Sequence, residues 1–192
     1  MSPRPGMPPA GIALDSIEIS FSSRGRSNRN RLGSYGLLTI TKSISILGDG
    51  HGGIAASGGA TDKINLRGVV IEGFGTGSSG IVFNTGASLN IQDSIIRNFA
   101  SIGIIVQPTA ATPQLNVSGT LVSDLGTGIA VDIHPTGSGS VNAVLDHVEL
   151  DSSFNGLLVL GDNTSGSINA TMADSVVSNY NGPASPDHRA KA

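Results

Sequence analysis

Short apolar runs recur along the middle of the chain, separated by glycine, serine, threonine and asparagine. Five of them share one phrase, an asparagine between two apolar residues, at 64–66, 89–91, 115–117, 141–143 and 168–170. The asparagines are 25, 26, 26 and 27 residues apart, and a further step of 26 back reaches Thr39 in the run 38–40. The chain therefore contains an internal repeat of about 26 residues.

Each repeat carries two more apolar runs. The second follows almost at once, at 69–71, 95–96, 121–122 and 176–177, and the third opens on glycine, at 80–83, 103–106, 128–131 and 156–159. These runs are too short for helices, and β-branched residues dominate them. The pattern predicts three short strands per repeat, with the small polar residues at the corners.

A repeat of this length indicates a solenoid, because one coil cannot bury its own apolar side chains and must stack on its neighbours. Each strand then pairs in parallel with its counterpart one coil away. We therefore predict an all-β parallel β-helix of about six coils over residues 34–182. Residues 1–33 form a proline- and arginine-rich segment that we expect to be irregular, and residues 183–192 a flexible tail.

The chain resembles the right-handed parallel β-helix superfamily, the pectate-lyase-like fold, and especially its small bacterial members of unassigned function. The resemblance covers about residues 36–182 and is carried by the repeat and by phrases such as Asp93-Ser94-Ile95-Ile96-Arg97-Asn98. It implies a right-handed winding, carbohydrate-active relatives, and an extracellular or cell-surface location.

Composition excludes several classes of protein. Of 192 residues, 27 are glycine, 4% are aromatic and none is cysteine, which excludes an aromatic core, a disulfide framework and thiolate chemistry. Hydrophobic residues make up 38%, which argues against general disorder. No apolar run is long enough to span a membrane, and the N-terminal residues lack a signal-peptide pattern.

Charge is divided unevenly along the chain. Residues 1–33 carry five arginines and two acidic residues, whereas residues 34–182 carry four basic and eleven acidic residues, a net charge of −7. Such a body would repel a polyanion such as pectate unless a metal ion bridged the two. The arginine cluster at 24–31 has no interleaved aromatic residues, so a solvated arm is favoured over nucleic-acid binding.

Stacking converts the repeat into columns of side chains. One predicted column runs along the outside of the solenoid and consists of Thr39, Asn65, Asn90, Asn116, Asn142 and Asn169. Stacked amides bond to one another, so the column is expected to stabilise the coils. As an alternative, it is a polar strip that binds carbohydrate.

A second predicted column stands where the second strand of each coil ends, and it consists of Asn98, Asp124, Asp151 and Asn179. It too can serve as a stabilising ladder. The functional alternative is a Ca²⁺ site, because Asp124 and Asp151 would be neighbouring carboxylates and oxygen ligands of this kind suit calcium.

Acidic and histidine residues are densest at 146–151. Alternation places His147 and Glu149 on one side of their strand, with Asp146 preceding them, and one coil earlier Asp132 and His134 share a side. A histidine beside carboxylates can act as a general base toward water. The alternative is a charged outer face without chemistry.

Three functions compete at this stage. The first is a hydrolase or lyase, assisted by Ca²⁺, that acts on a carbohydrate or a small ester or lactone. The second is a non-catalytic carbohydrate-binding module, and the third is a structural repeat of a surface protein. In each case the last ten residues offer no cap for the solenoid, so we expect homo-oligomers, formed end to end or side by side.

Overall fold

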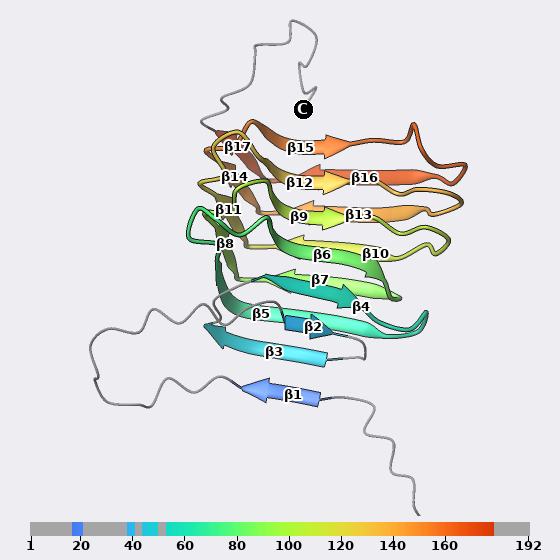
Figure 1. Ribbon diagram of the computed structural model, residues 1–192, viewed down its shortest axis with the longest axis horizontal. Coiled ribbons are helices and arrows are strands. Elements are labelled where there is room, and N and C mark those ends of the chain that lie inside the picture. The colour runs from blue at the N-terminus through green and yellow to red at the C-terminus, as the bar shows by residue number, and fades with distance from the viewer. Residues whose placement is uncertain (1–16, 21–37, 41–43, 50–52, 179–192) are drawn as a thin grey trace, which may run out of the picture.

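The computed structural model describes residues 17–20, 38–40, 44–49 and 53–178. This part of the chain contains seventeen β-strands, and the pairs formed between them are parallel. The strands wind in about five turns of a β-solenoid (Figure 1). The predicted parallel β-helix is confirmed, with about five turns in place of six. None of the described residues forms a helix long and apolar enough to cross a membrane.

The strands stack into three walls, here called the first, second and third faces. The first face consists of β1 (Ile17–Ser20), β3 (Ile44–Asp49), the start of β5 (Lys63–Glu72), β7 (Ser88–Gln92), β10 (Gln114–Ser118), β13 (Val141–Asp146) and β16 (Ile168–Ala173). The second face consists of the end of β5, β8 (Ile95–Arg97), β11 (Leu121–Ser123), β14 (Glu149–Asp151) and β17 (Val176–Ser178). The third face consists of β2 (Leu38–Ile40), β4 (Ile54–Ser57), β6 (Ser79–Thr85), β9 (Ile102–Val106), β12 (Ile129–Ile133) and β15 (Asn155–Val159).

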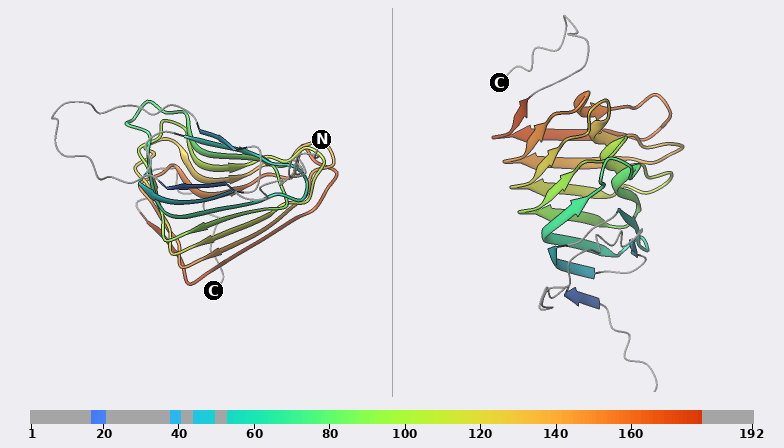
Figure 2. Two further views of the ribbon diagram at one scale, coloured as in Figure 1. Left: turned by 90° about the horizontal axis from the view of Figure 1, so that it is seen from below. Right: turned by 60° about the vertical axis from the view of Figure 1, so that its left-hand side comes forward.

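The first and second faces form one continuous 11-stranded sheet because β5 turns the corner between them. Its first half pairs with β7 and its second half with β8. The third face is a separate 6-stranded sheet. Viewed along the axis, the first and third faces are distinct walls that converge on one side, and the second face closes the other (Figure 2).

The core consists of aliphatic columns that run along the axis between the faces. In the first face Leu66, Ile91, Val117 and Leu145 stack in register, and all are at most 1% exposed. Equivalent columns line the second and third faces. Each fully buried aliphatic side chain contributes about 1.5–3 kcal/mol relative to exposure, so stacking supplies most of the stability.

At the corners the backbone adopts a positive-φ conformation that most residue types avoid. Between the first and second faces, each turn passes through one residue with positive φ: Gly68, Asp93, Gly119, His147 and Asp174. Between the second and third faces, Asn98, Asp124 and Ser152 take the same conformation. Glycine, aspartate and asparagine tolerate it best, which explains why they recur at these points in the repeat.

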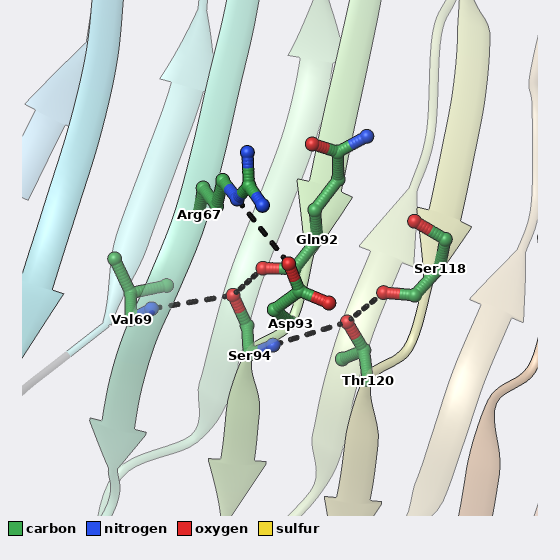
Figure 3. Close-up of polar contacts among 7 residues, drawn as sticks. All are labelled: Arg67, Val69, Gln92, Asp93, Ser94, Ser118 and Thr120. Carbon is green, nitrogen blue, oxygen red and sulfur yellow. Dashed lines mark hydrogen bonds and ion pairs between the residues drawn. The ribbon is translucent and has the colours of Figure 1, made fainter.

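Hydroxyl groups tie successive corners together (Figure 3). Ser94 Oγ donates to the carbonyl of Gln92 and accepts from the N–H of Val69 one turn away. Thr120 repeats this arrangement with Ser118 and Ser94. The phrase Asp93-Ser94 is therefore a structural element of the corner, with a positive-φ residue followed by a residue that binds backbone.

The predicted asparagine column forms only in part. Asn90 donates to Asn65 at 2.7 Å and Asn116 donates to Asn90 at 2.8 Å. The column then breaks, because Asn116 pairs with Val144. Asn142 and Asn169 form a second, separate ladder.

Thr39 does not belong to the asparagine column at all, which corrects the prediction. It lies in β2 of the third face and pairs with Ala55, whereas Ser45 of β3 pairs with Asn65. The step from Thr39 to Ala55 is 16 residues and that from Ser45 to Asn65 is 20 residues, so this early turn is shorter than the repeat of about 26 residues. Of the predicted terminal segments 1–33 and 183–192, the described residues include only β1.

Candidate functional site

Asp132 is a buried carboxylate on the outer side of the third face. Its neighbours in β12, Val131 and Ile133, belong to the core, so alternation turns Asp132 outward. It pairs with Ile105 of β9 and Leu158 of β15, within an otherwise apolar column.

The carboxylate of Asp132 has no partner for one of its oxygens. The residue is 5% exposed, and its Oδ1 makes no hydrogen bond. No other buried side-chain nitrogen or oxygen within the described ranges lacks a partner. Because such a group costs free energy, it points to a function other than stability.

Burial raises the pKa of Asp132, and the charge of nearby His134 offsets part of that rise. A carboxyl group with a raised pKa holds its proton closer to neutral pH and can donate it to a leaving group. The structure thus places the predicted pair Asp132 and His134 on one side of β12, where they interact electrostatically.

His134 is held by the loop of the next turn. Its Nε2 lies 3.2 Å from Asn163 Nδ2 and 4.0 Å from Asp162 Oδ1. The tautomer of the His134 ring decides whether Nε2 donates or accepts in the contact with Asn163. Asp162 and Asn163 were not among the predicted site residues, although they follow a third-face strand one turn after His134.

A row of amides leads along the third face toward this histidine. Asn84 donates to Ser57 Oγ at 3.3 Å, and Gln107 donates to Asn84 Oδ1 at 3.1 Å. The backbone of His134 continues the ladder by bonding to Val106. The outer side of the third face thus combines hydrogen-bonding side chains with the apolar column that contains Asp132.

Asp146 and His147, two other predicted catalytic residues, lie at the corner between the first and second faces. His147 Nδ1 is 2.9 Å from Asp146 Oδ1. Asp174, at the same corner one turn later, completes a group whose ligand atoms all lie within 4.8 Å of one another. Asp174 was not among the predicted site residues, although Asp174-Ser175 repeats the corner phrase Asp93-Ser94.

The predicted catalytic residues therefore fall into separate places. Asp132 lies in β12 of the third face and His134 directly follows that strand, whereas Asp146 and His147 lie at the corner between the first and second faces. Glu149 is exposed in β14 on the second face. These residues are divided between two places because successive strands of a coil belong to different walls.

The predicted calcium ligands do not share one register position. Val122 pairs with Leu150, which puts Asp151 level with Ser123, and Asp124 level with Ser152. Asp151 accepts hydrogen bonds from Ser152 and Ser178, and Asp124 accepts one from Ser123.

The other two predicted ligands are Asn98 and Asn179. Asn98 lies at the corner near Glu72, and Asn179 is outside the described residues. Among the described residues, Asp124 and Asp151 are thus offset by one position in register, and the calcium site stays a prediction.

Glu72, at the end of the second face, is another buried carboxylate. Burial alone would raise its pKa, but hydrogen bonds from the side chains of Arg97 and Asn98 and from the Phe74 backbone lower it overall. Arg97 Nε lies 2.7 Å from Glu72 Oε2. This carboxylate is satisfied, unlike Asp132, and its role is structural.

Comparison of the chain with protein-family models, with curated proteins and with solved structures found no match.

Proposed function

We propose that this protein is a hydrolase, or a lyase, that acts on a neutral carbohydrate or a small ester or lactone at the outer side of the third face. The observation that supports this is the buried carboxylate of Asp132, with an oxygen lacking a hydrogen bond and with His134 beside it. We also infer a place in the right-handed, pectate-lyase-like superfamily and at the cell exterior, by analogy with its three-faced solenoids.

The chemistry follows from the two side chains. In hydrolysis, His134 takes a proton from water, the hydroxide attacks the substrate carbon, and Asp132 donates its proton to the departing oxygen as the C–O bond breaks. The raised pKa suits Asp132 for this role. The net charge of −7 on residues 34–182 favours an uncharged substrate.

Calcium assistance is a separate part of the proposal. Asp124 and Asp151, with Asn98 and Asn179, were its predicted ligands, and their offset in register weakens that assignment. The group Asp146, His147 and Asp174 offers other oxygen and nitrogen ligands. A test with chelator is therefore needed independently of the test of Asp132.

The test is a screen of the full chain against neutral polysaccharides, esters and lactones, with calcium and with chelator. If a substrate is found, Asp132→Asn should lower kcat by about 100-fold or more, the usual contribution of an acid–base group. The matched control is Asp93→Asn. Asp93 lies at the corner between the first and second faces, and its carboxylate forms an ion pair with Arg67. Full activity in Asp132→Asn would reject the site.

A non-catalytic carbohydrate-binding module is the second candidate. The hydrogen-bonded row of Ser57, Asn84 and Gln107 favours this binding function, because these side chains lie beside apolar residues on one face. A glycan array read without turnover would distinguish the two functions. Binding that survives Asp132→Asn but is lost in Gln107→Ala, with no hydrolysis of any bound glycan, would favour the binding module.

A further inference from the structure

The apolar core is open at the C-terminal end of the described solenoid. Met172 is the last member of the column Leu66, Ile91, Val117 and Leu145, and Val177 stacks on Leu150. Met172 is 39% exposed and Val177 is 44% exposed, whereas Leu145 and Leu150 are fully buried. Val159 likewise stacks on buried Ile133 and is 42% exposed.

The strands at this end also have a free edge. Within the described part of the chain, β15, β16 and β17 each pair with one strand only, on the side of the preceding turn. Exposed edges are normally protected by charges, prolines or bulges. These three strands, Asn155–Val159, Ile168–Ala173 and Val176–Ser178, contain no charged residue and no proline.

The following residues do not have the composition to continue the core. Residues 179–192 contain two prolines and one tyrosine, and no valine, isoleucine, leucine, methionine or phenylalanine. The next third-face strand would fall near residue 183, where Pro183 and Pro186 stand, and proline cannot donate to a sheet ladder. Residues 179–192 therefore offer few apolar side chains with which to extend the aliphatic columns.

We propose that a second copy of this chain binds here, C-terminal end against C-terminal end, related by a twofold axis. An isologous contact of this kind closes after two copies, joins β16 to its partner copy in antiparallel pairing and buries both open cores. The end strands carry no charge, whereas residues 34–182 as a whole carry a net charge of −7. The uncharged strand edges can therefore approach each other without bringing like charges together within the paired strands, although the loops of the same turn carry Asp162 and Asp174. This proposal is independent of the hydrolase.

The first test is sedimentation of the full chain over a range of concentrations. We expect a monomer–dimer equilibrium that Val177→Lys shifts to monomer, because it places charge on the end surface. The matched control is Val144→Lys, since Val144 is similarly exposed at 46% but points outward from β13, away from the core. Circular dichroism of both variants verifies that they fold.

A second test distinguishes the twofold arrangement from other contacts. The chain has no cysteine, so single cysteines can be introduced without background. Under oxidation, Ala170→Cys in β16 should give a disulfide-linked dimer and Val144→Cys should not. A monomer at every concentration, a dimer unaffected by Val177→Lys, or an open filament without the Ala170→Cys link would overturn the proposal.

Discussion

Asp132 offers a test at the level of a single residue. Replacing it with leucine should raise the free energy of unfolding at neutral pH by about 1–3 kcal/mol, because a buried, incompletely bonded carboxylate is removed. Leucine would continue the apolar column of Ile105 and Leu158. Denaturant unfolding of parent and variant measures the difference. A less stable variant would contradict our description of the site.

The gain in stability should depend on pH in a defined direction. The pKa of Asp132 in the folded protein is raised above its ordinary value of 3.8. Its contribution is therefore fully present below that value and is lost as the pH rises through the folded-state pKa. The advantage of Asp132→Leu should widen over this range. Asp174→Leu, at an exposed position, should show no comparable gain.

At the scale of the strands, the asparagine ladders make unequal contributions. Asn90 bonds to both Asn65 and Asn116, whereas Asn142 has one such bond, to Asn169. Asn90→Ala should cost about 1–3 kcal/mol, because two bonds are lost and two amides are left unpaired. Asn142→Ala, at an exposed position, should cost less. Thermal unfolding of the two variants compares them, and equal losses would contradict the ladder's role.

The corner between the second and third faces depends on close packing. A Cβ at Gly103 would collide with Val122 of the second face and with the carbonyl of Ala130 one turn on. Gly103→Ala should therefore destabilise the protein by about 1–3 kcal/mol through overpacking.

Gly126 provides the control for this corner. A Cβ there meets nothing within 4 Å, although φ is +58°. Gly126→Ala should lower the free energy of unfolding only by the cost of holding alanine in the left-handed conformation, about 1–2 kcal/mol. Denaturant midpoints of both variants separate steric collision from backbone strain, and a Gly103→Ala variant as stable as the parent would contradict the packing.

At the scale of the whole molecule, calcium binding can be detected as a change in melting temperature. An ion that binds only the folded chain raises its melting temperature by mass action. If the calcium prediction holds, calcium should raise the melting temperature, chelator should reverse it, and Asp124→Ala or Asp151→Ala should weaken it. Loss of the shift in Asp174→Ala alone would assign the ion to the corner group. An unchanged melting temperature would end the calcium hypothesis.

The class of fold could be predicted from the sequence because a solenoid is assembled from local contacts. Each apolar run stacks on the run one repeat away, so the repeat length already states which segments are neighbours. The corner residues were predictable for a similar reason. Only a few residue types tolerate positive φ, and these mark each bend, as Asp93 and Asn98 do.

Register could not be predicted in the same way. Strand side chains alternate with a period of two, so a shift of two residues leaves the same side chains in the core. Asn116 could therefore align with Asn142 or with Val144 at no cost to the pattern, and in the structure it aligns with Val144, with Leu115 level with Ala143. A shift of one residue separates Asp124 from Asp151 at their corner, where no alternation restrains the chain.

The burial and hydrogen bonding of the candidate-site residues depend on groups that lie far apart along the chain. Asp132 and His134 were predictable as neighbours on one side of a strand. The burial of Asp132 comes from Ile105 and Leu158, one turn away on either side, and His134 meets Asn163 across a loop. Local sequence therefore determined the walls and their corners, whereas side-chain burial and charge arose only when separate turns were stacked, because solvent exclusion needs neighbours on every side.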